Sequence, residues 1–258
     1  EGLLKNADTA MYRAKAQTNS YRFFAPETQG RVTDRLTLVQ DLHRALERGE
    51  LVLRYQPYVA LATRRLVGGQ AHVQWERRTG RESTICRHAR VVPQPDLMRV
   101  VQEAGLIAPI TEWMVRTTCA DARAWQSPGS PLVRVAVHLS RQQFAQAHIV
   151  DSVVQALRET GLDPRCLDLE LAEGIFMPEA ESTAVKLREL HALGLALSIA
   201  DFGTGYSSLG DLKQFSIQGL RIGRDFVCRL TTDPDRAAIV SAIIAMAHGL
   251  KMTVVAEG

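Results

Sequence analysis

The stretch that decides the fold is ADFGTGYSSL, residues 200–209. It follows an apolar run over residues 195–200 that predicts a buried strand, and Asp201 stands where that strand ends. Two glycines then allow a tight turn and a close approach of backbone to a ligand, and Ser207 can cap a helix over residues 207–215. A strand, a glycine turn and a helix start predict a ligand-contacting loop on an α/β framework.

Two common interpretations of this loop fail. A DFG tripeptide also occurs in protein kinases, but no HRD loop or VAIK strand accompanies it here. The G-x-G pattern is not followed by a third glycine at the spacing of the dinucleotide-binding fingerprint. The loop therefore belongs to another kind of α/β protein.

Outward from the loop, extended and helical patterns alternate from about residue 51 to the end. Residues 166–171 place three leucines on one face, and Ser140 with Gln143 has the spacing of a helix capping box. Repeated β-then-α units with short connections predict a mostly parallel sheet, closed or open. The expected strands cover residues 51–57, 66–75, 132–139, 166–171, 195–200, 220–222 and 252–256.

Polar side chains gather where these strands end. In α/β folds the carboxyl ends of parallel strands meet at one edge, which carries the functional site. A solvated strand end also collects polar residues, but the repetition favours a shared mouth. The residues concerned are Gln70, His138, Glu170, Asp201 and Glu257.

Composition narrows the class of protein. The chain has 258 residues, 46% of them hydrophobic and 23% charged, which excludes intrinsic disorder and suits one barrel-sized domain. No run approaches the roughly 20 apolar residues that span a bilayer, and the first residues lack a secretory signal. Four scattered cysteines suggest neither a disulfide framework nor a zinc site, so we expect a cytoplasmic setting. The net charge of +3 permits an anionic ligand without requiring nucleic acid.

Several motifs, in order, resemble those of EAL domains, the phosphodiesterases of bacterial cyclic di-GMP signalling. The loop at residues 201–209 resembles the family's DFGTGYSSL. The other matching segments are Tyr55-Gln56-Pro57, Glu103 to Ile107, Val137 to Ser140, Leu169 to Glu173, Leu220 to Ile222, and Val254 to Gly258. The resemblance implies a modified TIM (β/α) barrel with a two-metal site at the strand carboxyl ends, and hydrolysis of cyclic di-GMP to a linear dinucleotide. The last strand of that barrel is expected to be missing from the chain.

The start of the chain does not share the β/α alternation. Residues 7–24 form a helix and a short strand by pattern, and they resemble the end of a GGDEF (diguanylate cyclase) domain without its signature loop. Residues 34–48 have apolar positions at helical spacing. We therefore expect a GGDEF remnant at residues 1–24, a linker or capping helix at 25–50, and a degenerate EAL domain at 51–258.

The resemblance also indicates which catalytic positions have changed. The signature EAL is Gln70-Ala71-His72 here, the family's asparagine ligand is His138, and its catalytic lysine is matched by Arg221. Metal-binding carboxylates are lost at Gln70, Ala200 and Gly223, whereas Glu170, Asp201 and Glu257 survive, with Glu173 as support. Because two Mg²⁺ or Mn²⁺ ions need several hard oxygen ligands, we expect no metal cofactor. At most one weakly held ion is expected, on Glu170, Asp201 and His138.

Nucleotide binding is a separate question from hydrolysis. The family holds a phosphate with an arginine at the position of Gln74, and a neutral amide is a weaker donor. His72 can replace the lost charge only when it is protonated. Binding of cyclic di-GMP is therefore expected to be weakened or lost. The remaining candidate contacts are Gln56, Pro57, His72, Gln74, Phe202, Gly203, Thr204, Gly205 and Tyr206.

A segment rich in arginine, residues 76–90, holds five arginines against two glutamates. It is either a solvated loop, a docking surface for an acidic partner, or an alternative source of phosphate-binding arginine. It lacks aromatic stacking residues, which argues against single-stranded nucleic acid. Family analogy also permits a homodimer near residues 206–212.

Three functional hypotheses remain open at this point. The first is an inactive EAL module that regulates by binding a protein partner. The second is a cyclic di-GMP receptor that does not hydrolyse its ligand. The third is a residual metal-dependent phosphodiesterase, in which Glu257 and Arg221 are vestiges of the catalytic set.

Overall fold

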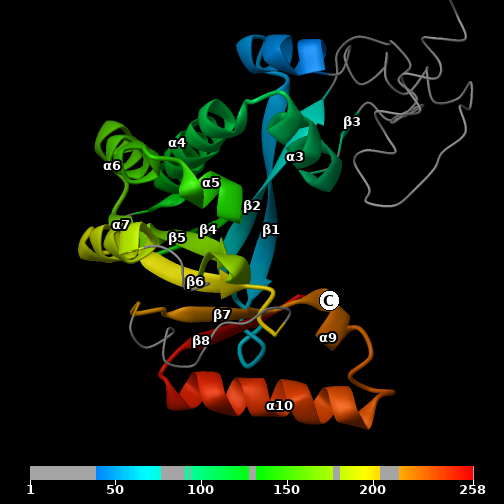
Figure 1. Ribbon diagram of the computed structural model, residues 1–258. Helices are drawn as coiled ribbons and strands as arrows, with labels where there is room; N and C mark the ends of the chain where they lie inside the picture. Colours follow the sequence, from blue (N-terminus) through cyan, green and yellow to red (C-terminus); the bar gives the residue numbers. More distant parts are fainter. Residues whose placement is uncertain are drawn as a thin grey trace, which may run out of the picture. The chain divides into compact units, whose positions relative to one another are not determined.

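The computed structural model describes residues 39–76, 91–92, 94–127, 132–176, 181–203 and 215–257 (Figure 1). The chain divides into two compact units, one of residues 1–51 and 75–104 and a larger one of 52–74 and 105–258. The expected remnant at 1–24, the loop at 77–90 and residues 204–214 lie outside the described residues.

The described part of the smaller unit is built around Trp75. Residues 39–47 are helical, β3 (Val91–Val92) pairs antiparallel with the end of β2, and α3 covers Gln94–Glu103. Trp75 is fully buried, and its indole Nε1 donates to Glu50 Oε2 over 3.1 Å. The hydrogen bond satisfies a polar atom that burial would otherwise leave without a partner.

The larger unit is organised by one curled sheet. It begins with β1 (Leu51–Val59) and β2 (Leu66–Glu76), whose six-residue connection is too short for a parallel crossover and makes a hairpin. From β2 onward, the strands along the order β2-β4-β5-β6-β7-β8 are all parallel. The remaining strands are β4 (Arg134–Leu139), β5 (Leu167–Ala172), β6 (Ala196–Ala200), β7 (Gly219–Ile222) and β8 (Thr253–Ala256).

All seven strands predicted from the sequence are confirmed, and so is the α/β barrel-type fold. The short β3 was not expected, because two residues carry no periodicity that a pattern can report. The hairpin at the start also departs from the expected β-then-α alternation.

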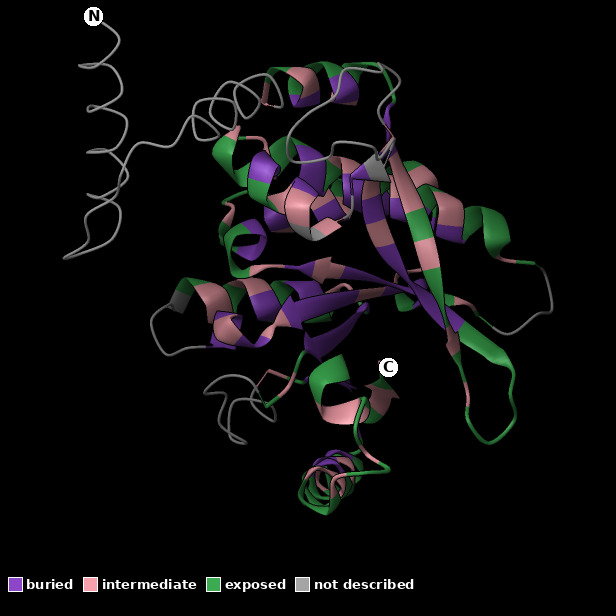
Figure 2. Cartoon of the chain, turned by 90° about the vertical axis from the view of Figure 1, so that its right-hand side faces the viewer, coloured by how far each residue is buried: buried purple, intermediate pink, exposed green. Residues whose placement is uncertain are grey.

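The outer face of the sheet is apolar and packs against helices. Leu167, Leu169 and Leu171 of β5 are fully buried, and Figure 2 shows the central strands as largely buried. The helix α4 packs on β4, and the helix α10 packs on β7 and β8. The described helices of this unit are α4 (Ile107–Trp125), α5 (Arg141–Ala145), α6 (Ile149–Thr160), α7 (Glu181–Ala192), α9 (Arg224–Val227) and α10 (Pro234–Gly249), with 3-10 turns at Pro164–Cys166 and Glu173–Phe176. None of the helices in the described ranges is long and apolar enough to span a membrane.

Local sequence signals fix where these helices begin and end. The predicted capping box at α5 is confirmed, since Ser140 accepts from the Gln143 amide and Gln143 Oε1 accepts from the Ser140 amide. Lys186 of α7 donates to three carbonyls at the other end of α5, those of Phe144, Ala145 and Gln146. The short helix that follows β4 is therefore held at both ends.

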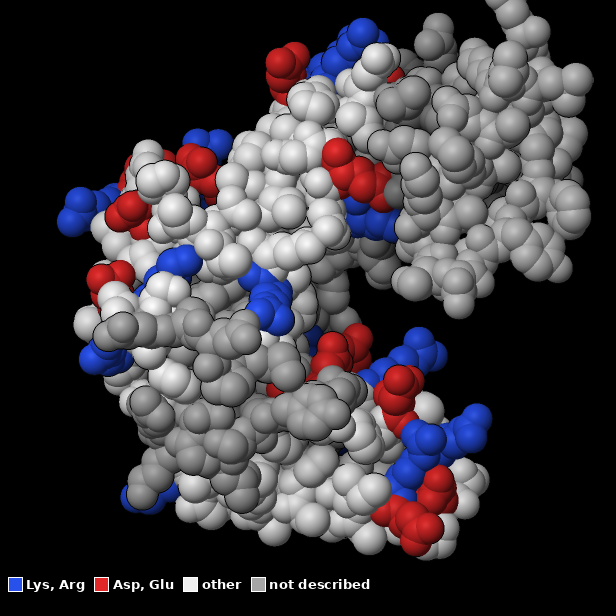
Figure 3. Space-filling view, viewed as in Figure 1, with Lys and Arg blue, Asp and Glu red and all other residues white. Residues whose placement is uncertain are grey.

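The outer surface near α9 and the start of α10 carries both signs of charge. Arg224, Asp225 and Asp235 are exposed there, and acidic and basic side chains alternate over this region in Figure 3. Mixed charge of this kind is typical of a solvated face rather than of a basic field for nucleic acid.

Candidate functional site

The site lies on the inner face of the curled sheet, where small and polar residues replace the leucines of the outer face. Parallel pairing sets His138 of β4 beside Glu170 of β5, and Glu170 beside Ser198 of β6. The register brings the ends of β4, β5 and β6 to one level, whereas Gln70 of β2 pairs with Ala136. Side chains as distant in sequence as Gln70 and Glu170, a hundred residues apart, therefore meet.

Glu170 and Arg221 form a buried ion pair at the centre of the site. The guanidinium Nη1 lies 2.9 Å from Glu170 Oε1, and the two side chains are only 7% and 2% exposed. Gln70 Nε2 donates to the other oxygen, Glu170 Oε2, over 3.1 Å. Oε2 therefore accepts a hydrogen bond, whereas Oε1 is held by the charge of Arg221 without a hydrogen bond from the described residues.

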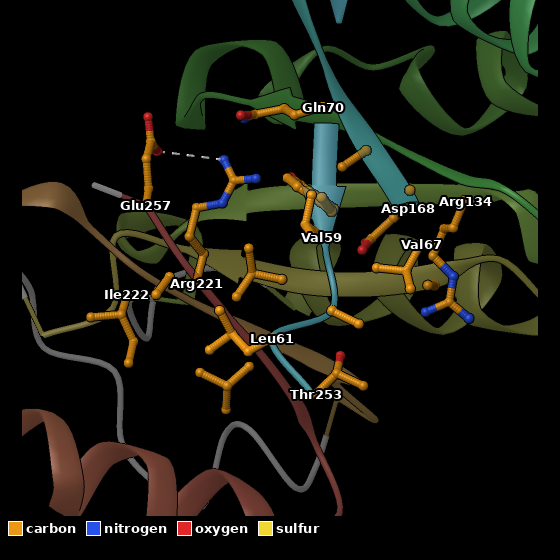
Figure 4. Close-up of a pocket in the computed structure, with 18 of the residues that line it drawn as sticks. Val59, Leu61, Val67, Gln70, Arg134, Asp168, Arg221, Ile222, Thr253 and Glu257 are labelled. Carbon is orange, nitrogen blue, oxygen red and sulfur yellow. Dashed lines mark ion pairs between the residues drawn. The ribbon is translucent and has the colours of Figure 1, made fainter. Parts of the chain in front are cut away.

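Arg221 has two further neighbours. Its Nη1 lies 3.8 Å from Glu257 Oε2, the contact that is dashed in Figure 4, and Glu257 is 36% exposed. Its Cζ lies 5.1 Å from the centroid of the Tyr58 ring on β1. Burial lowers the pKa of Arg221 to about 10, while Glu257 opposes the change, so the guanidinium stays charged at neutral pH.

Burial has the opposite effect on Glu170. It raises the pKa of this carboxyl, and the neighbouring carboxylates of Asp168, Asp201 and Glu257 add to the rise. The Arg221 guanidinium, 2.9 Å away, acts in the other sense and holds the carboxyl in its ionised form.

His138 is held in its neutral form. Burial lowers its pKa, the carboxylates of Asp201 and Glu257 oppose this, and His72 reinforces it. His72 shares a hydrogen bond of 3.2 Å with Gln56 of β1. The two histidines are thus part of one polar surface above the ion pair, and His138 brings no positive charge at neutral pH.

Asp201 follows β6 in an unusual backbone conformation, with φ of 49°. A Cβ added to Gly223 would lie 2.7 Å from Asp201 Oδ1, so the Asp201 side chain fills the space next to Gly223. The amide of Phe202 donates to the Arg221 carbonyl over 3.1 Å and ties this corner to β7. Position 223 can therefore carry a side chain only if Asp201 moves.

A cavity of about 1270 Å³ opens beside these residues. Gln56, Pro57 and Tyr58 of β1 line it together with Gln70, Arg221 and Glu257 (Figure 4). Its volume exceeds the several hundred Å³ typical of small-ligand pockets. It extends along the inner face of the sheet to Asp168 and Arg134 near the other ends of their strands.

Asp168 was not among the residues predicted for the site. It lies two residues before Glu170 on the same face of β5, and its Oδ1 accepts from Ser198 Oγ over 2.8 Å. Burial raises its pKa, whereas the Ser198 hydrogen bond and Arg134 lower it. The alternation along β5 was a sufficient signal to place it inside.

The predicted site residues are brought together only in part. Gln56, Pro57 and Gln70 line the cavity, and Glu170 and Glu257 contact Arg221. His72, Gln74 and Phe202 do not line the cavity, although His72 bonds to Gln56. Thr204, Gly205 and Tyr206 lie outside the described residues.

Tyr58 was also missed by sequence reasoning, although its signal was present. It shares the inner face of β1 with Gln56, two residues earlier, as strand alternation requires. What the alternation could not report is that an arginine from β7 stacks on its ring.

Comparison with known proteins identifies relatives of the chain. The model for "EAL domain" matches residues 39–258. The chain is 41% identical over 257 residues to the bifunctional diguanylate cyclase/cyclic di-GMP phosphodiesterase MucR of Pseudomonas aeruginosa, covering 99% of this chain and 36% of MucR. It is 36% identical to the cyclic di-GMP phosphodiesterase NbdA of the same organism, covering 100% of this chain and 32% of NbdA. The chain thus spans about a third of the length of these relatives.

Solved structures agree with the sequence relatives. The PaMucR phosphodiesterase in complex with c-di-GMP has a TM-score of 0.77 to this chain at 40% identity, with 86% of each chain covered. The FimX EAL domain of Xanthomonas citri in complex with c-diGMP has a TM-score of 0.74 at 20% identity, covers 88% of this chain and 85% of its own, and supports the fold alone.

These comparisons correct the prediction about cofactors. MucR, NbdA and the PaMucR structure are named as phosphodiesterases, and EAL homologues of this kind depend on Mg²⁺ or Mn²⁺. The prediction of no metal cofactor, with at most one weakly held ion, is therefore wrong. Single ligand positions differ from the family, but the similarity extends over residues 39–258.

The described side chains do not fit a pair of such ions in the arrangement seen here. Within the described ranges, no group of three or more His, Cys, Asp or Glu residues is placed to hold a metal ion. A cation at Glu170 would have to take the place of the Arg221 guanidinium, 2.9 Å away. We therefore assign no chemical step to a metal in this arrangement.

Proposed function

The chain belongs to the EAL domain family of cyclic di-GMP signalling proteins, and we propose that it binds cyclic di-GMP but does not hydrolyse it. The observation that carries the proposal is the buried pair of Glu170 and Arg221. It engages with Arg221 a carboxylate that metal-dependent catalysis would need as a free ligand, while Arg221 still lines the adjoining cavity.

Nucleotide binding is supported by the cavity and by kinship. The cavity has room for a dinucleotide, and Gln56 and Pro57 line it on the β1 side. The PaMucR phosphodiesterase, 40% identical, is known as a c-di-GMP complex. We propose that Gln56 and Pro57 contact the ligand within the cavity, and that the candidates which do not line the cavity contact the part of the ligand that extends beyond it. These candidates are His72, Gln74, Phe202 and the Gly203–Tyr206 loop.

Loss of hydrolysis is supported by the residues at the strand ends. Gln70 offers a neutral amide, and Ala200 and Gly223 offer no side-chain ligand atoms. Arg221 supplies a delocalised guanidinium in place of the compact ammonium of a lysine, and it is engaged by Glu170 and Glu257. Glu170, Asp201, His138 and Glu257 are, in this proposal, remnants of a catalytic set.

A module that binds without turnover needs an output, and we propose a regulatory protein partner. The arginine-rich residues 76–90 are the proposed docking segment, because five arginines favour an acidic partner. We also propose that residues 1–24 are the end of a GGDEF domain and that residues 25–50 connect it to the EAL domain at 51–258.

Two measurements on the full chain test the proposal. Isothermal titration with cyclic di-GMP in EDTA is expected to give micromolar or tighter binding, which Gln56→Ala weakens. Incubation with Mg²⁺ or Mn²⁺, followed by chromatography, is expected to yield no linear dinucleotide, whereas the PaMucR phosphodiesterase run in parallel yields it. Absence of binding refutes the receptor proposal, and metal-dependent product refutes the loss of hydrolysis.

A residual phosphodiesterase is the second candidate, and the kinship to enzymes such as MucR and NbdA favours it. The same incubation decides between the two. Linear product that forms with Mg²⁺ or Mn²⁺ and disappears in Glu257→Ala assigns the activity to this site rather than to a contaminant.

A further inference from the structure

Within the described residues, one edge of the Arg221 guanidinium has no hydrogen-bond or ion-pair partner. Both of its ion-pair contacts, with Glu170 and with Glu257, are made by Nη1. Among the described residues, none hydrogen-bonds to Nε or Nη2, and Arg221 lines the cavity. In Figure 4 the guanidinium reaches into the cavity between Gln70 and Val59.

From this arrangement we propose that Arg221 is the phosphate-binding residue of the cavity, holding a phosphodiester of the ligand through Nε and Nη2. The inference rests on the proposed binding of cyclic di-GMP and names the residue that carries it. Two parallel N–H donors match two phosphate oxygens, which a single ammonium or an amide cannot do.

The other two arginines that line the cavity are less suitable than Arg221 as phosphate-binding residues. Arg134 and Arg165 also line it, but they lie near the amino ends of β4 and β5, where Arg134 pairs with Gly68, two residues before Gln70. Arg165 makes a close ion pair with Asp163, 2.6 Å between Nη2 and Oδ2. Within the described lining, Arg221 is the cation at the strand ends where the nucleotide is expected.

The surroundings hold the guanidinium in one orientation. Glu170 fixes Nη1 from one side, Gln70 fixes Glu170, and the Tyr58 ring lies 5.1 Å from Cζ. Little side-chain entropy is then lost when an anion binds, because the arginine is ordered before the ligand arrives. Glu170 is thus a positioning residue for Arg221.

Glu257 competes with the ligand for the same arginine. Its contact is the longer one, 3.8 Å against 2.9 Å, and its side chain is 36% exposed against 2% for Glu170. A phosphate that approaches Arg221 meets repulsion from this carboxylate, which can turn toward solvent. Removing the charge at position 257 should therefore strengthen binding of the phosphodiester. Removing the two parallel N–H donors of Arg221 should weaken it.

The test is isothermal titration of cyclic di-GMP, in EDTA at one ionic strength, into the full chain and its variants. Arg221→Lys keeps the positive charge but loses the two parallel N–H donors of the guanidinium. It is expected to weaken binding of cyclic di-GMP about tenfold or more. Glu257→Gln is expected to tighten binding about threefold or more. Arg158→Lys, the same substitution at an exposed residue of α6 that does not line the cavity, is the matched control and is expected to bind like the wild type.

The outcomes separate this inference from the function on which it rests. Wild-type binding that Arg221→Lys leaves unchanged, or that Arg158→Lys weakens equally, overturns the inference and leaves the receptor function standing. A wild type that does not bind overturns both. If thermal unfolding shows Arg221→Lys to be misfolded, the double variant Glu170→Gln/Arg221→Gln removes both charges together and decides: retained affinity overturns the inference, and at least tenfold loss supports it.

Discussion

At the scale of single residues, the site is governed by burial as much as by charge. Glu170, Arg221 and His138 are each shifted by burial against their charged forms. A group of polar side chains on the inside of a sheet is therefore less charged than its sequence suggests.

His138 gives a test of this point through pH. Because its pKa in the folded chain is lowered, the unfolded chain takes up a proton that the folded chain refuses as pH falls below about 6.5. His138 is thus expected to cost the folded state stability with a slope of up to about 1.4 kcal/mol per pH unit, between about pH 6.5 and the lowered pKa. Urea unfolding at several pH values between 5 and 8 measures this. As the pH falls, the free energy of unfolding should decrease less steeply in His138→Asn than in the wild type.

The control for this prediction is His191, an exposed histidine on α7. His191→Asn makes the same substitution away from the buried site and is measured in parallel. Equal slopes in the wild type and in His138→Asn would contradict the assignment of a neutral, buried His138.

At the scale of elements, the pairing of β2 with β4 depends on the absence of a side chain at Gly68. A Cβ added there would lie 2.4 Å from the Arg134 carbonyl oxygen, a backbone atom that cannot rotate away. Gly68→Ala is therefore expected to lower the free energy of unfolding by about 1–3 kcal/mol. Thermal or urea unfolding measures this directly.

Gly174 offers the matched substitution. It lies in the 3-10 turn at Glu173–Phe176, where an added Cβ meets nothing within 4 Å. Gly174→Ala should change the free energy of unfolding by no more than about 0.5 kcal/mol. A tolerated Gly68→Ala would mean that the two strands can separate without loss.

The elements themselves could be predicted, because leucine and valine alternation marks the outer face of each parallel strand. Of the polar residues at the strand ends, Gln70 bonds to Glu170, and Glu170 and Glu257 both contact Arg221. The ion pair could not be predicted, because it depends on the register between strands and on how far each side chain reaches. The cavity likewise follows from the curl of the sheet, which no local pattern encodes.

At the scale of the whole molecule, the reactivity of the cysteines reports how often the larger unit unfolds. Cys119 of α4 is fully buried, and burial raises the pKa of its thiol to about 12, whereas Cys228 is exposed. In iodoacetamide at pH 8, Cys228 should be modified at once. Cys119 should react at least about 1000-fold more slowly, at a rate set by unfolding.

Peptide mass spectrometry over a time course distinguishes the two sites. Addition of urea to the unfolding midpoint should bring the two rates together. Rapid modification of Cys119 without denaturant would show that α4 leaves the sheet far more easily than its packing on β4 and α6 implies.

The buried pair of Glu170 and Arg221 also constrains which mutations the gene can accumulate. Replacing either residue alone by an uncharged one removes the nearest opposite charge of the other, which is buried. A lineage that changes this pair must therefore cross a less stable intermediate or alter both codons together. Positions 170 and 221 should accordingly covary among descendants of this sequence, inherited as one unit rather than two.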